Sequence, residues 1–109
     1  MFIDNIFYAI LTDKDGNEFK LSEEQLKNAF SNCLKELRKY KAYTLQAVSD
    51  GTGIPTPTVL RYESGENTPS IIQAYKFSQF YNIGLEEMFL AGYLSDDERE
   101  KIFDESVKN

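Results

Sequence analysis

Four oxygen-bearing side chains near the N-terminal end have a spacing that could bind calcium. Asp13, Asp15, Asn17 and Glu24 occupy positions one, three, five and twelve of an EF-hand type of loop. Position six is Glu18, where such a loop needs a glycine for its sharp turn, and the residues before Asp13 have the pattern of a strand. The pattern therefore favours a plain hairpin turn, with calcium binding as the alternative.

The composition leaves few side chains for catalysis. Histidine is absent, which removes the commonest general base and the commonest metal ligand. The one cysteine, Cys33, allows no intramolecular disulfide and is too little for a structural zinc site. It falls on the apolar stripe of a predicted helix, where a small buried residue is expected. We therefore expect no enzyme, no metal site and no cofactor.

The length and composition are typical of one folded domain. The chain has 109 residues, of which 41% are hydrophobic and 14% aromatic, and this balance argues against intrinsic disorder. No apolar run reaches the ~20 residues of a membrane helix. The segment Met1–Asn5 has an acid where a signal peptide has lysines. We expect a soluble, cytoplasmic protein with no membrane partner.

A β-hairpin is predicted at the N-terminal end, from the apolar run Phe2–Leu11 and the segment Asn17–Leu21. The Asp15-Gly16 pair between them fits a tight turn, because glycine accepts the positive φ that hairpin turns need. A lone two-stranded hairpin is marginal in water, and Ile6–Leu11 is too apolar to leave exposed. We predict that the hairpin takes part in self-association, with covering of the first helix within one chain as the alternative.

Capping and breaking residues divide the rest of the chain into helices. Ser22 with Gln25 forms a capping box before a helix that extends to about Tyr40. The apolar stripe of this helix repeats at spacings of three and four, as a core-facing helix requires: Leu26, Ala29, Phe30, Cys33, Leu34 and Leu37.

Five further helices follow from the same signals. Thr44 caps a short helix of residues 45–52, and Gly53 ends it. Proline is tolerated at the start of a helix, so Pro55 and Pro57 place the next one at 56–64. The remaining helices are expected after Ser70 to about Tyr81, at 85–90, and after Ser95, where an acidic helix has only Ile102, Phe103 and Val107 as its apolar face.

The charge is unevenly distributed along the chain. Residues 35–65 hold five bases and three acids, a net of +2. Residues 1–34 hold three bases and six acids, a net of −3, and residues 66–109 hold four and nine, a net of −5. A locally basic middle in a chain of net charge −6 is compatible with one surface that faces nucleic acid, and equally with ordinary solvated charge.

The middle of the chain resembles a known DNA-binding family. Residues 44–54 (TLQAVSDGTGI), residues 58–65 (TVLRYESG) and Pro69-Ser70 are similar to lambda-repressor-like helix-turn-helix domains of the Cro/CI type, or XRE family, over about 34–89. The resemblance implies a mainly α fold: a five-helix helix-turn-helix bundle at 22–92, flanked by the N-terminal hairpin at 1–21 and the acidic C-terminal helix at 93–109.

The resemblance also implies where DNA would bind. Helix 56–64 would enter the major groove of double-stranded DNA, as one half of a homodimer. Arg38 would pair with Glu63 and so orient that helix. Arg61 is the favoured base or phosphate contact, since its fork fits guanine or a phosphate. The full set implied for groove and backbone contacts is Thr44, Gln46, Thr56, Pro57, Thr58, Leu60, Arg61, Ser64, Asn67 and Thr68.

Two functions are compatible with these features. The first is sequence-specific DNA binding by a transcriptional regulator, expected to be a phage or bacterial repressor. The alternative is an antitoxin or a phage-encoded inhibitor that acts mainly on a protein partner, because an apolar Leu60 at the groove-facing side fits a protein as well as a thymine methyl.

Overall fold

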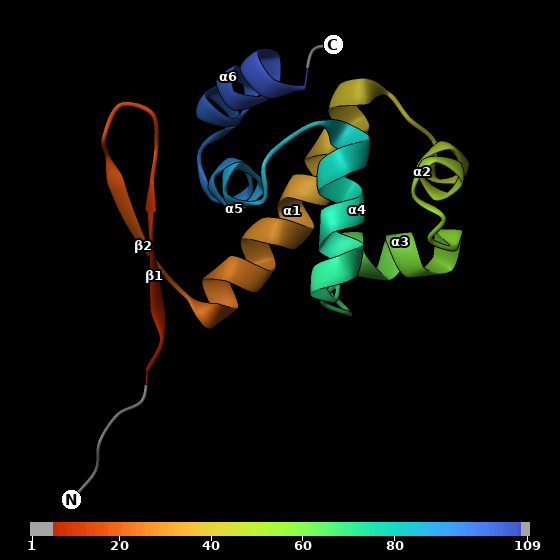
Figure 1. The fold of residues 1–109 in the computed structure, drawn as a ribbon, viewed down its shortest axis with the longest axis horizontal. Helices are drawn as coiled ribbons and strands as arrows, with labels where there is room; N and C mark the ends of the chain where they lie inside the picture. The colour runs from red at the N-terminus through yellow and green to blue at the C-terminus, as the bar shows by residue number, and fades with distance from the viewer. Residues whose placement is uncertain (1–5, 108–109) are drawn as a thin grey trace, which may run out of the picture.

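The structure, a computed structural model, describes residues 6–107 of the chain. Within these residues it consists of one antiparallel two-stranded sheet and six helices, so the expected mainly α class with an N-terminal hairpin is confirmed. In chain order the elements of Figure 1 are β1 (Tyr8–Thr12), β2 (Glu18–Ser22), α1 (Glu23–Lys41), α2 (Leu45–Thr52), α3 (Thr56–Ser64), α4 (Ile71–Tyr81), α5 (Leu85–Tyr93) and α6 (Asp96–Ser106).

The predicted helix starts agree with the structure because local hydrogen bonds set them. Ser22 and Gln25 form the predicted capping box, with the Gln25 N–H 3.2 Å from the Ser22 hydroxyl. Thr44, Ser70 and Ser95 each accept a hydrogen bond from the backbone N–H three residues later. These side chains satisfy N–H groups that a helix leaves unpaired in its first turn.

The core is built around α1. Its stripe packs against α5 on one side and α3 on the other, and the six predicted positions are buried except Leu26, which is half-buried. α5 runs to Tyr93 rather than ending at Leu90, so the expected length was too short. The added turn is held by a close approach of Gly92 to α1, where a Cβ would lie 1.7 Å from the Ala29 carbonyl oxygen.

The hairpin lies on the helical body with one face. In its register Leu11 opposes Phe19 and Ala9 opposes Leu21, and Leu11 and Leu21 pack with Ala29 and other side chains of α1 and α5. The first strand was expected from Phe2, but it begins at Tyr8, so the expectation was wrong for residues 6 and 7. The rest of the expected start, residues 2–5, lies outside the described part of the chain. The other face of β1 is exposed, through Tyr8 and Ile10.

In the turn between the strands, neighbouring N–H groups donate hydrogen bonds to the Asp13 carboxylate. Asp13 accepts hydrogen bonds from the backbone N–H groups of Asp15 and Asn17, each at 2.9 Å, and from the Asn17 side chain. These bonds lower the pKa of the Asp13 carboxyl. Glu18 begins β2 and Glu24 lies on α1, so the geometry favours the hairpin turn over the calcium loop. Across residues 6–107 no group of three acidic, cysteine or histidine side chains is placed to hold a metal.

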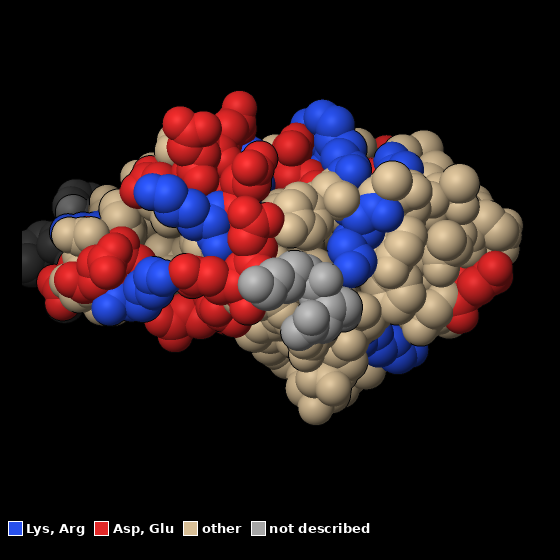
Figure 2. Space-filling view, turned by 90° about the horizontal axis from the view of Figure 1, so that it is seen from above, with Lys and Arg blue, Asp and Glu red and all other residues tan. Residues whose placement is uncertain are grey.

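Acidic side chains gather at one end of the molecule. The hairpin lies at the opposite end of the long axis from α2 and α3 (Figure 1), and Figure 2 shows acids crowded over the half that holds the hairpin and α6. An ion pair between Lys14 of the turn and Glu105 of α6 joins these two elements. In residues 6–107, no helix combines the length and the apolar character needed to cross a membrane.

Candidate nucleic-acid interface

A tight turn fixes α2 and α3 relative to each other. Gly53 ends α2 in the left-handed region at φ 76°, and its N–H donates to the Ser49 carbonyl oxygen at 2.8 Å. The buried Thr52 hydroxyl donates to the Val48 carbonyl oxygen and accepts from the Ile54 N–H. The side chains of Val48 and Ile54 are fully buried on either side of the turn. The two helices are therefore held rigidly by the core.

An ion pair with a buried carboxylate fixes α3 on α1. Arg38 donates to both carboxylate oxygens of Glu63, from Nε at 2.8 Å and from Nη2 at 3.1 Å, and from Nη1 to the Tyr43 carbonyl oxygen at 3.2 Å. The Glu63 side chain is only 4% exposed. The hydrogen bonds to Glu63 raise the pKa of Arg38. This pair, which the family resemblance implied, holds the last turn of α3 in one orientation.

The two faces of α3 differ sharply. Val59 and Tyr62 pack into the core together with Glu63, and Tyr62 meets Phe77 of α4 edge to face. The opposite face is solvent-exposed and consists of residues spaced as one side of a helix: Pro57, Leu60, Arg61 and Ser64. Leu60 is 50% exposed, and the Arg61 side chain is also half exposed, with Nε 3.9 Å from a Glu66 carboxylate oxygen. That separation leaves the guanidinium open to a stronger partner.

The other residues implied by the resemblance also lie at the surface. Thr56 and Thr58 in the first turn of α3 are half-buried, and Ser64, Asn67 and Thr68 at its end are exposed. At the start of α2, Thr44 caps the helix while the Gln46 side chain donates to Asp50 at 2.8 Å. The structure thus places the ten candidates at the start of α2, on α3 and in the loop after α3.

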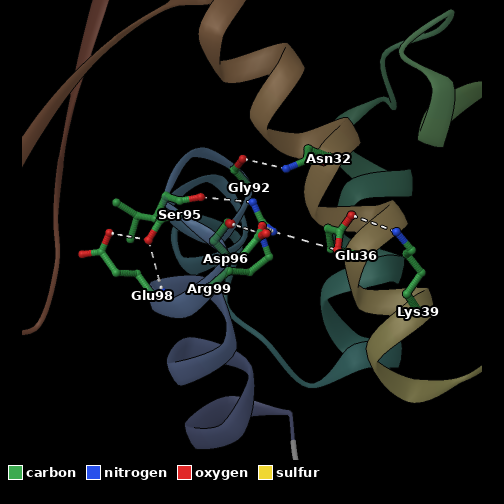
Figure 3. A network of polar contacts seen from close by, with 10 residues as sticks. Asn32, Glu36, Lys39, Gly92, Ser95, Asp96, Glu98 and Arg99 are labelled. Carbon is green, nitrogen blue, oxygen red and sulfur yellow. Dashed lines mark hydrogen bonds and ion pairs between the residues drawn. The ribbon is translucent and has the colours of Figure 1, made fainter.

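A buried arginine, Arg99, anchors α6, and the sequence gave no reason to single it out. Arg99 donates to the carbonyl oxygens of Ala91 and Leu94 at 2.7 and 3.0 Å and to Asp96 at 2.7 Å, and it lies 3.9 Å from Glu36 of α1 (Figure 3). The nearby Asn32 side chain donates to the Gly92 carbonyl oxygen. Arg99 lies six residues after the end of α5 in an acidic helix, and no motif of the sequence marks it.

Comparisons with known proteins agree with this geometry. The helix-turn-helix family model (HTH_3) matches residues 34–88. The chain is 28% identical over 72 residues to the cryptic phage CTXphi transcriptional repressor RstR of Vibrio cholerae, covering 66% of this chain and 65% of that protein. It is 30% identical over 79 residues to the uncharacterized HTH-type transcriptional regulator YqaE of Bacillus subtilis (strain 168), covering 72% and 64%. The matched part thus spans less than two thirds of either relative.

A solved structure has the same fold. The crystal structure of a transcriptional regulator from Listeria innocua superposes with a TM-score of 0.51 at 20% identity, over 67% of this chain and 84% of that one.

Proposed function

Because this chain belongs to the helix-turn-helix family of the XRE type, we propose that it is a sequence-specific DNA-binding transcriptional regulator that inserts α3 into the major groove. The observation that carries the proposal is the exposed outer face of α3 on a helix that the Arg38–Glu63 pair fixes on α1. A reading helix needs both properties, since its side chains must reach base edges from a defined orientation. Residues 22–92 are the unit that we assign to this task.

Arg61 is the strongest candidate for a specific contact. Its guanidinium has only a distant pairing with Glu66, which a guanine edge or a phosphate would replace. Leu60 beside it would meet a thymine methyl, while Thr56, Pro57 and Thr58 would approach the duplex at the start of α3.

Contacts to the phosphate backbone come from small polar groups in this proposal. Thr44 and Gln46 lie at the start of α2, where backbone N–H groups favour an anion. Ser64, Asn67 and Thr68 lie at the end of α3 and in the loop that follows. With so few cations, the affinity for non-specific duplex should be weak, and DNA shape would carry part of the specificity.

Repression is the regulatory role that we propose, because the Vibrio cholerae relative is named as a repressor. The protein would act as a homodimer on two half-sites about one helical turn apart, the arrangement that suits a helix-turn-helix unit.

Selection of bound duplexes from a random library tests the proposal. The wild-type chain should enrich a palindromic site, and Arg61→Ala should weaken binding to it by about 1–3 kcal/mol. Lys101→Ala removes the same charge from the exposed side of α6 and serves as the matched control, with affinity unchanged. Enrichment of no sequence, or an equal loss in both variants, would remove α3 as the reading helix.

A second candidate function is supported by the exposed Leu60 and by the net charge of −6. In it the chain acts mainly on a protein partner, as an antitoxin or a phage-encoded inhibitor does. The salt dependence of duplex binding separates the two functions, because phosphate contacts require affinity to fall steeply with salt. Absence of duplex binding even at low salt would favour the protein partner.

A further inference from the structure

A groove lies where the turn of the hairpin meets α5 and α6, and we call it the turn groove. Its floor is apolar and consists of Leu90, which is buried, and Leu94 and Ile102, which are half-buried. These three side chains pack in the same cluster as Leu11 and Leu21 of the hairpin. The turn groove is built from the hairpin side of the molecule, away from α2 and α3 (Figure 1), so it is a surface separate from the candidate nucleic-acid interface.

Charged side chains form the rim of the turn groove, and acids outnumber bases. The acids come from the turn, α5 and α6, and the bases from the turn and α6: Asp13, Asp15, Glu87, Glu98 and Glu105, against Lys14 and Lys101. Five acids and two bases give the rim a net charge of −3. Within residues 6–107 the rim makes one ion pair, between Lys14 and Glu105. The groove thus lies in the half of the molecule over which acids crowd (Figure 2).

The acids on the α5 and α6 sides of the rim have only uncharged partners within the chain. Glu87 accepts hydrogen bonds from a backbone N–H at 3.0 Å and from the Ser106 hydroxyl at 2.9 Å. Glu98 accepts one from the Ser95 hydroxyl at 3.0 Å. Hydrogen bonds from neutral donors fix the two carboxylates in place but leave their negative charge uncompensated. A cation from another molecule would therefore find carboxylates that are already positioned.

The size and the charge of the turn groove fit a segment of a protein partner. Its volume is about 190 Å³, below the roughly 300–1,000 Å³ of pockets that enclose a drug-sized molecule, so it suits one or two side chains. The floor selects an apolar side chain, and the rim selects lysine or arginine next to it. A duplex, or a second copy of this chain with its net charge of −6, would bring negative charge to the acidic rim.

We propose that the turn groove docks a basic segment of a protein partner, with one apolar side chain on the floor and lysine or arginine side chains on the rim. The inference goes beyond the proposed function and does not depend on it, because the groove shares no residue with the candidate nucleic-acid interface. The partner and a duplex should therefore bind to the chain at the same time.

Selection from a random library of short displayed peptides, with the full chain as bait, tests the proposal. We expect the enriched peptides to carry a net positive charge and an apolar residue among the basic ones. The most enriched peptide is then synthesised, and its affinity for the full chain is measured by calorimetry. Replacement of its apolar residue by serine should weaken binding by more than about tenfold, because burial on the floor contributes more than charge attraction alone.

Paired variants of the chain locate the site. Glu87→Gln/Glu98→Gln removes two rim charges, while glutamine keeps the hydrogen-bond acceptor that each carboxylate supplies at its helix start. We expect this variant to weaken peptide binding by about fivefold or more. The matched control is Glu86→Gln/Glu100→Gln, which removes two exposed acids from the same helices outside the groove and should keep the wild-type affinity.

A third variant should strengthen binding. Lys14 pairs with Glu105 across the rim and so competes with a cation of the partner. Lys14→Gln should raise the affinity for the peptide about twofold, as expected for release of one exposed ion pair. The amide chemical shifts of the full chain should move on peptide addition at Leu90, Leu94 and Ile102.

Several outcomes would overturn the inference: enriched peptides without basic residues, an equal loss in both double variants, or chemical shifts that move chiefly on α3 or α4. Weaker self-association of the free Glu87→Gln/Glu98→Gln variant would also overturn it, since a second copy would then cover the groove. Peptide binding at the groove by a chain that binds no duplex would support the inference and refute the DNA-binding proposal. Duplex binding by a chain that enriches no peptide would do the reverse.

Discussion

Two arginines secure α3 and α6 on the rest of the molecule, and they use different partners to do so. Arg38 makes two hydrogen bonds to Glu63, whose side chain is 4% exposed. Arg99 donates mainly to carbonyl oxygens around the end of α5, and its close carboxylate partner, Asp96, is 95% exposed. The α3 end therefore depends on a buried carboxylate, whereas the α6 end depends on the cation and on backbone groups that a helix leaves unpaired at its C-terminus.

The largest effect is expected from removal of the buried carboxylate. Glu63→Ala leaves the Arg38 guanidinium without its main partner and should lower the free energy of unfolding by about 3 kcal/mol. This is the low end for a buried pair, because the Arg38 side chain is 25% exposed. Urea denaturation measures the loss, and Glu63→Gln, which keeps the shape and one acceptor, should lose about half as much. A loss below about 1 kcal/mol for Glu63→Ala would show that the pair is not what holds α3.

Removal of the second arginine should have a smaller and more local effect. Arg99→Met keeps an apolar stem and removes three charge-assisted hydrogen bonds, which should cost about 2 kcal/mol. Hydrogen exchange should quicken in residues 96–106 and stay unchanged in α3, and binding to DNA should persist. Lys101→Met on the exposed side of α6 is the control. An equal increase in the hydrogen-exchange rate of α3 would mean that the stability of α3 and of α6 is coupled.

The exposed partner of Arg99 should matter little. Asp96→Ala should change the free energy of unfolding by no more than about 0.5 kcal/mol, because an ion pair to a solvated carboxylate contributes little. Ser95→Ala, one residue earlier, removes the cap of α6 and should cost about 1 kcal/mol in the same thermal or urea measurement. The reverse order of the two losses would contradict the assignment of α6 stability to the cap and the cation.

The range of the contacts explains how much of the fold the sequence predicted. Caps and turns such as Thr44 and Gly53 act within a few residues, so the bounds of α2 and α3 could be predicted. The Arg38–Glu63 pair spans 25 residues and followed only from the resemblance to a family. Arg99 could not be placed, because its acceptors become available only when α5 continues to Tyr93, and that depends on Gly92 meeting α1.

The candidate site shows a similar limit. The outer face of α3 followed from helical spacing once Val59 and Tyr62 were taken as buried. The sequence of α4 carries apolar residues on several sides of the helix and does not tell which of them the core covers. The structure buries Phe77 and Tyr81 and leaves Ile71, Ile72 and Tyr75 exposed, since α4 is packed on one side only. The spacing of these residues separates them into two sides of the helix, but only tertiary packing decides which side faces the core.

The smallest effect is expected at low pH, in the turn of the hairpin. The pKa of Asp13 lies below the ordinary value of 3.8, chiefly because the Asn17 side chain donates to its carboxylate. A lowered folded-state pKa stabilises the turn above pH 3.8, and this stabilisation is lost as the pH falls through the lowered value. An NMR titration should show the Asp13 carboxyl titrating below 3.8. The Asp15 and Asn17 amides, which donate to this carboxylate, should lose protection over the same range while those of α3 do not. Asn17→Ala removes the largest cause and should move the Asp13 titration and the loss of the turn to higher pH. A wild-type titration at or above 3.8 would show that the turn does not depend on the ionised carboxylate.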